Sequence, residues 1–166
     1  MNITQLVFAW PRDAQYSCEP DTYDGWAIED YDFEISGAPL ALGDVRTWEG
    51  RQWTVATLED YSPVDGADQG FNVAVLTLDG QVPQRDSWEG AGRRVMYVCI
   101  SPDDVLFGLP EHPEALPDIG SEVHDMPGWV ASTLREFAPA DRGSYDQVLV
   151  YWCAAAVLDH AHAMAA

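Results

Sequence analysis

The sequence predicts an α+β fold, in which a small, strongly bent antiparallel sheet carries two or three short helices within a single domain of residues 1–166. Segments with strand character, separated by Gly, Pro and Asp turns, fill the first hundred residues. Signals that start helices appear only after residue 100. The 47% hydrophobic content, with seven Trp and seven Tyr, is enough for a packed core.

The first two predicted strands lie before residue 36. The segment ITQLVFAW (3–10) ends at Pro11, and IEDYDFEI (28–35) alternates between apolar and acidic side chains. We expect the second of these strands to be half buried, with a ladder of carboxylates facing water. Its apolar face consists of Tyr31, Phe33 and Ile35, and its acidic face consists of Asp30, Asp32 and Glu34.

Two hairpins are predicted next. VRTW (45–48) and RQWTVATL (51–58) are joined by Glu49-Gly50, whose glycine can adopt a positive φ. FNVAVLTL (71–78) is apolar on both faces and is followed by Asp79-Gly80, a dipeptide preferred in type I′ turns. The next strand, QVPQRDSW (81–88), is assigned to an edge because of Pro83. RRVMYVCI (93–100) is apolar on both faces and is predicted to be central.

The segment at about 101–145 is predicted to be helical or irregular. Ser101 followed by Pro102 favours a short helix that ends near Gly108. A second helix is predicted from Pro127, because apolar side chains between 129 and 137 fall on one helical stripe. YDQVLVYWC (145–153) has the composition of a buried strand, and the alanine-rich end of the chain favours a helix.

The order of strands and turns between Leu40 and Trp88 resembles that of SH3-like small barrels. The resemblance is at the level of the fold, and it implies a partial barrel at about 40–100. Small barrels often bind peptides with aromatic side chains. In this chain the aromatic residues that the resemblance would crowd on one side are Trp48, Trp53, Tyr61 and Trp88.

The hairpin at 43–61 is the predicted recognition surface. Since alternate residues of a strand face opposite sides, Trp53 shares a face with Val55 and is assigned to the core. Trp48 shares a face with Arg46 and is assigned to the surface, where the guanidinium could stack on the indole. The predicted binding residues are Arg46, Trp48, Tyr61 and Trp88.

The charge is strongly unbalanced, with 28 carboxylates against eight cations and a formal net charge of −20. Such a chain repels nucleic acids and anionic membranes, so we expect neither direct nucleic-acid binding nor membrane binding, and we expect a protein partner with a basic face. Five arginines cluster in the middle of the chain. They could grip an anionic ligand, but pairing with the acidic flanks is the preferred interpretation. These arginines are Arg46, Arg51, Arg85, Arg93 and Arg94.

Three widely spaced cysteines, Cys18, Cys99 and Cys153, predict reduced thiols, with at least the last two buried. The first residues carry no basic segment typical of a signal peptide, and the longest apolar run, residues 148–158, is too short to span a bilayer. We therefore expect a cytoplasmic protein.

The predicted function is a non-catalytic binding or accessory module without a cofactor, because no catalytic or nucleotide-binding motif is present. One alternative is a metal-dependent hydrolase that uses a loop at 111–125. Another is an acidic inhibitor or nucleic-acid mimic, since the carboxylate ladder repeats at about 7 Å, close to the phosphate spacing of one strand. The candidate metal ligands of the hydrolase are Glu111, His112, Glu122, His124 and Asp125.

Overall fold

The fold was obtained as a computed structural model, which describes residues 1–11, 18–86, 95–101, 117–123, 127–140 and 143–155, together with the backbone of 105–111. Ten strands and no helix are present over these ranges, so the predicted α+β class is wrong and the described chain is all-β. No helix there is long and apolar enough to cross a membrane. The strands are β1 (Asn2–Ala9), β2 (Asp21–Tyr23), β3 (Trp26–Ser36), β4 (Val45–Trp48), β5 (Arg51–Pro63), β6 (Gly70–Thr77), β7 (Val95–Ile100), β8 (Val105–Glu111), β9 (Trp129–Pro139) and β10 (Gln147–Ala155).

All ten strands belong to one mixed sheet with the order β2-β3-β1-β6-β5-β9-β10-β7-β8, and β4 pairs with β5 beside this path. Two of the pairs, β1 with β6 and β10 with β7, are parallel. The sheet is therefore neither small nor purely antiparallel. The strands in the predicted barrel-like part at about 40–100 also pair with strands outside it: β6 pairs with β1, and β7 pairs with β10.

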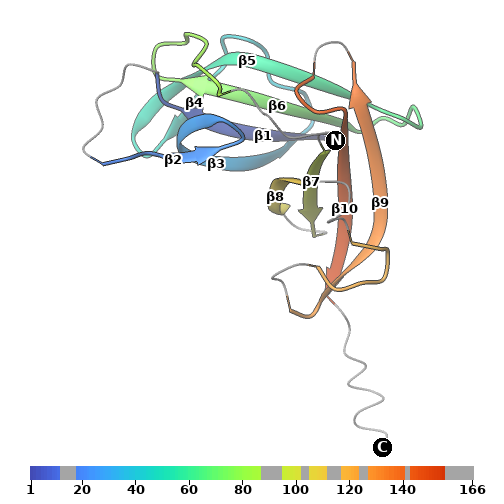
Figure 1. Cartoon of the computed structure of the whole chain (residues 1–166). Coiled ribbons are helices and arrows are strands. Elements are labelled where there is room, and N and C mark those ends of the chain that lie inside the picture. The colour runs from blue at the N-terminus through green and yellow to red at the C-terminus, as the bar shows by residue number, and fades with distance from the viewer. Residues whose placement is uncertain are drawn as a thin grey trace, which may run out of the picture.

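The sheet consists of two halves that share a corner. We call β2, β3, β1, β6, β5 and β4 the first half-sheet, and β9, β10, β7 and β8 the second. Among the described strands, the ladders of the two halves meet only where the last three residues of β5 pair with the last three of β9. Figure 1 shows the strands of the first half-sheet running across the direction of β7, β9 and β10. The sheet thus folds over on itself and encloses a core between its halves.

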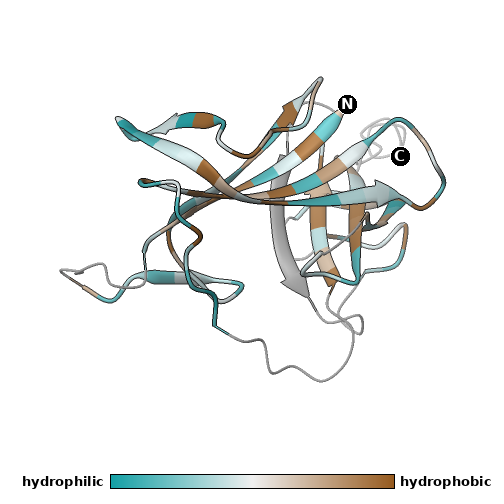
Figure 2. Cartoon of the chain, turned by 90° about the horizontal axis from the view of Figure 1, so that it is seen from above, coloured by the Kyte–Doolittle hydropathy of each residue, from teal (hydrophilic) through white to brown (hydrophobic). Residues whose placement is uncertain are grey.

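Three hydrophobic clusters result from this folding. The largest lies between the half-sheets and includes Val7, Phe71 and Phe137. A second cluster, around Cys99 and Tyr151, covers the outer face of the second half-sheet, and a third, around Phe8 and Trp53, covers the outer face of the first. Because both faces are covered, β6 and β7 are buried almost throughout, as their continuous apolar sequences predicted. Figure 2 shows the alternation of hydrophobic and hydrophilic residues along other strands.

The predicted helix after Pro127 is wrong, since Trp129–Pro139 forms β9. This strand pairs antiparallel with β10, and Ala131 and Phe137 are its buried side chains. The aromatic and β-branched residues of the segment suit a strand as well as a helical stripe. The segment is a strand and not a helix because it pairs with β10, which follows later in the chain.

The helix predicted from Ser101 to Gly108 is also wrong, because Val105–Glu111 forms β8 and pairs with β7. The strand predicted at 81–88 is absent from residues 81–86, where Arg85 makes only an isolated bridge to Trp26. The alanine-rich end beyond Ala155 lies outside the described residues.

Candidate functional site

The hairpin of β4 and β5 forms as predicted, with a two-residue turn at Glu49 and Gly50. Both turn residues have positive φ, 47° and 75°, as in a type I′ turn. This turn aligns Trp48 with Arg51 across the ladder and therefore Arg46 with Trp53. Residues directly opposite each other in an antiparallel pair share a face. The prediction that the two tryptophans face opposite sides is therefore wrong, since both lie on one face.

That face packs onto the outer side of β1. Trp53 is fully buried, which confirms its assignment to the core, and its ring lies 5.4 Å from Phe8 and 5.5 Å from Trp10. Trp48 stacks on Phe8, with ring centroids 4.9 Å apart and planes inclined by 17°. Trp48 is half-buried, so most of the aromatic surface of the hairpin packs against the protein's own side chains.

Two ion pairs connect the hairpin to β3. Arg46 binds Glu34 through two hydrogen bonds, of 2.9 Å from Nε and 2.8 Å from Nη2, and Arg51 contacts Glu29 at 3.1 Å. The hydrogen bond from Arg46 lowers the pKa of the Glu34 carboxyl. These contacts agree with the interpretation that the arginines pair with the acidic flank. Arg93 and Arg94 lie outside the described residues.

The central carboxylates of β3, those of Asp30 and Asp32, have no arginine partner among the residues that the structure describes. Asp30 and Asp32 each accept a hydrogen bond of 2.8 Å from the backbone N–H of the following residue. Asp32 is exposed and Asp30 is half-buried. We call the four carboxylates of β3 the acidic strip: Glu29, Asp30, Asp32 and Glu34.

The other predicted binding residues do not join the hairpin. Tyr61 is fully buried and lies eight residues beyond Trp53 on β5, roughly 25 Å of extended chain away. Trp88 lies outside the described residues. The structure therefore brings together Arg46 and Trp48, whereas Tyr61 belongs to a different site.

The predicted metal-binding loop falls mostly on residues that the structure does not describe, including His112, His124 and Asp125. Glu122 is exposed and its backbone bridges to Val130. Within the described ranges no three His, Cys, Asp or Glu side chains gather in a way that could hold a metal ion.

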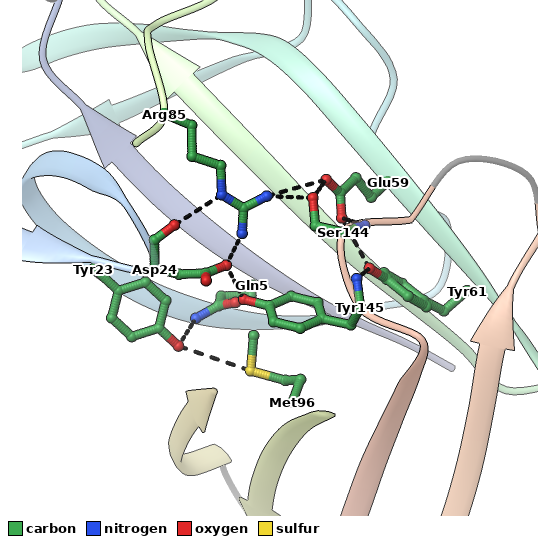
Figure 3. Close-up of polar contacts among 9 residues, drawn as sticks. All are labelled: Gln5, Tyr23, Asp24, Glu59, Tyr61, Arg85, Met96, Ser144 and Tyr145. Atoms are coloured by element: carbon green, nitrogen blue, oxygen red, sulfur yellow. Dashed lines mark hydrogen bonds and ion pairs between the residues drawn. The ribbon is translucent and has the colours of Figure 1, made fainter. Parts of the chain in front are cut away.

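A network of polar side chains, not predicted from the sequence, is centred on Arg85 (Figure 3). Its guanidinium pairs with the Asp24 carboxylate, and its Nε donates to the Asp24 backbone carbonyl at 2.8 Å. Arg85 also donates to the Ser144 hydroxyl and lies over the ring of Trp26, 5.2 Å from its centroid. The Tyr145 hydroxyl donates to the same carboxylate.

Glu59 anchors the other side of this network. One carboxylate oxygen accepts bonds from the Tyr61 hydroxyl at 2.9 Å and from the Ser144 backbone N–H at 2.8 Å, and the other accepts from the Ser144 hydroxyl. The Tyr61 hydroxyl in turn accepts the Tyr145 N–H at 3.0 Å. Burial, together with the negative charge of Glu59, raises the pKa of Tyr61, so this phenol stays protonated.

A second group of polar contacts lies beside this network, in the core (Figure 3). Gln5 donates to the Tyr23 hydroxyl at 2.6 Å, and that hydroxyl lies 3.8 Å from the sulfur of Met96 on β7. Burial raises the pKa of Tyr23. These contacts join β1 and β2 of the first half-sheet to the second half-sheet.

The network thus binds together segments that are far apart in the chain: the turn after β2, the second half of β5, the segment at 81–86 and the residues just before β10. Its two carboxylates, those of Asp24 and Glu59, accept hydrogen bonds from four residues: Tyr61, Arg85, Ser144 and Tyr145. This arrangement favours a structural role for the network, which holds distant segments together, over a role as a catalytic centre. One sequence signal could have located part of it, since Asp24-Gly25 is a dipeptide typical of a tight hairpin turn.

The chain matches no protein-family model, no curated protein and no solved structure. The fold and the site therefore define only a class: a chain that is all-β over the described residues, with a folded mixed sheet, the polar network around Arg85 and an acidic strip on β3.

Proposed function

We propose that the chain is a non-catalytic binding module that recognises a protein partner with a basic face, and that the acidic strip of β3 is the recognition surface. One observation carries this proposal. Every arginine in the part of the chain that the structure describes pairs with a carboxylate of the same chain, and Asp30 and Asp32 lie two residues apart on β3, between the paired Glu29 and Glu34, with no cationic partner among the described residues. The pairs are Arg46 with Glu34, Arg51 with Glu29, Arg85 with Asp24, and Arg135 with Asp65.

The aromatic hairpin has a supporting part in this proposal. Its inner face is occupied by Phe8 and by the two ion pairs to β3. It therefore holds the ends of the acidic strip in place, and the half-buried Trp48 stacks on Phe8, which lies opposite Asp30 in the ladder. Binding through Trp48 and Arg46 alone has less support, because both side chains already have partners within the chain.

Electrostatics favour a basic partner. A net charge of −20 attracts cationic surfaces over long range and accelerates their encounter, and salt screens this attraction. A nucleic-acid mimic has less support, because Arg46 compensates the third carboxylate of the predicted ladder, Glu34. We place the binding in the cytoplasm, which is supported by the free, buried thiols of Cys99 and Cys153.

The experiment is affinity capture from a lysate of the source organism, followed by reconstitution with each purified candidate. The test variant is Asp30→Asn with Asp32→Asn, in which the amide oxygens still accept the backbone hydrogen bonds. The control is Asp60→Asn with Asp68→Asn, two exposed carboxylates outside the strip. We expect the test variant to lose a basic partner that the control retains. Equal retention by both variants would contradict the proposal.

A further inference from the structure

One edge of β3 is not paired with any described strand over most of its length. β1 pairs with β3 along one side from Ile28 to Ser36, but β2 pairs with the other side only from Trp26 to Ile28. β8, at the opposite end of the strand order, comes close to β3 without forming a ladder with it. On their second side, residues 31–36 therefore form no ladder with any strand that the structure describes, and we call this side the free edge of β3.

The backbone groups on this edge follow from the ladder. In an antiparallel pair, successive residues direct their N–H and C=O groups alternately toward the partner strand and away from it. The N–H groups of Tyr31 and Phe33 donate to the preceding aspartates, so they point away from β1. The carbonyls of Tyr31, Phe33 and Ile35 consequently point outward as well, one every second residue.

Asp30 and Asp32 protect this edge. Their carboxylates occupy the outward N–H groups, and negative charge at an edge discourages pairing with other strands. A second copy of the chain is a poor occupant, because two such edges would bring two acidic strips together. An extended segment with basic side chains is a good occupant, since it neutralises the strip.

We propose that the free edge of β3 binds an extended basic peptide segment as an additional strand. The proposal rests on the function proposed above and specifies its mode of binding. The N–H groups of the segment donate to the outward carbonyls of Tyr31, Phe33 and Ile35. Lysine or arginine side chains at alternate positions draw the carboxylates of Asp30 and Asp32 away from the backbone, and the freed N–H groups donate to the segment. Main-chain bonds supply affinity, and the carboxylates select for positive charge.

The test uses an eight-residue peptide of alternating lysine and valine, with binding measured by titration calorimetry. Two further peptides have the same sequence but carry N-methyl groups at every other residue. One is methylated at the odd-numbered residues and the other at the even-numbered residues. These groups remove main-chain donors without changing the charge. We expect the pattern that blocks the edge-facing donors to weaken binding by roughly tenfold or more, because it removes several hydrogen bonds.

The outcomes separate this proposal from the preceding one. If both methylated peptides bind as tightly as the parent peptide, attraction to the acidic strip stands and strand addition is refuted. If no peptide binds even at low salt, both proposals fail. Hydrogen exchange gives a second measurement, since the parent peptide should slow exchange at Tyr31 and Phe33.

Variants of the strip complete the test. Asp30→Asn with Asp32→Asn keeps the acceptors for the backbone but removes two charges, and we expect binding of the parent peptide to weaken about fivefold, as two exposed ion pairs would predict. The control pair, Asp60→Asn with Asp68→Asn, should bind as the unmodified chain does. An equal loss in both pairs would show that only the net charge matters and would overturn the proposed site.

Discussion

Removal of the Arg85 side chain is expected to destabilise the protein far more than removal of Arg51, although each arginine pairs with a carboxylate. The difference is burial. The Arg85 and Asp24 side chains are 19% and 4% exposed, whereas those of Arg51 and Glu29 are 41% and 28% exposed. Arg85→Ala leaves a buried carboxylate without its cation, which costs about 3 kcal/mol or more. Exposed pairs of the second kind contribute about 0.2–1 kcal/mol.

The structure supports the larger value for Arg85. Its guanidinium also donates to the Asp24 carbonyl and to Ser144 and packs over Trp26, and alanine replaces none of these contacts. For a chain of this size, about 3 kcal/mol corresponds to a fall in melting temperature of roughly 6–12 °C.

Thermal unfolding followed by circular dichroism measures both variants, and urea titration checks that the slope of the transition is unchanged. A double-mutant cycle with Asp24→Ala isolates the pair: once the carboxylate is gone, loss of the arginine should cost much less. Two results would refute the reasoning. One is an equal, small effect of Arg85→Ala and Arg51→Ala, and the other is strict additivity in the cycle.

Three further changes have defined outcomes. Gly25→Ala should cost at least about 2 kcal/mol in a urea titration, because φ is +83° and the new Cβ would lie 2.7 Å from the Asp86 carbonyl oxygen; no loss would contradict this. Trp53→Ala should cost roughly 3–5 kcal/mol in the same assay and Trp48→Ala clearly less, because only Trp53 is fully buried, and equal losses would argue against the packing described. Glu34→Gln should lower the melting temperature at neutral pH. Because folding lowers the pKa of Glu34, its stabilisation is complete above the ordinary carboxyl pKa and disappears as the pH falls through the lowered value, so the difference between the two proteins should vanish in melts at low pH.

The strands that were predicted correctly are marked by sequence patterns that extend over only a few neighbouring residues. The alternation of Tyr31 and Phe33 with aspartates identified β3, and Glu49-Gly50 identified the hairpin of β4 and β5. The continuous apolar runs of β6 and β7 correctly predicted burial on both faces. Such patterns depend on neighbours in sequence, which are visible without the fold.

The errors concern features that depend on distant partners. β9 has a stripe of apolar residues that suits a helix, and it is a strand because β10 provides its hydrogen bonds. The polar network around Arg85 joins Asp24 to Arg85 and to Tyr145, which are 61 and 121 residues away from Asp24 in the sequence. No local pattern marks Arg85 as different from the other arginines. Register caused the error at the hairpin, since the two-residue turn fixes Trp48 opposite Arg51 and so places both tryptophans on one face.

The register of that hairpin also determines how charge is distributed on β3. Because Arg46 and Arg51 lie on its inner face, they reach Glu34 and Glu29, the two ends of the acidic strip, and leave the centre to Asp30 and Asp32. The ends of the strip are thereby neutralised and fixed, while the uncompensated charge is concentrated beside the free edge of the strand. A hairpin with the opposite face turned inward would leave four adjacent carboxylates repelling one another. The packing of the aromatic hairpin and the exposure of a short acidic centre therefore have a common structural cause.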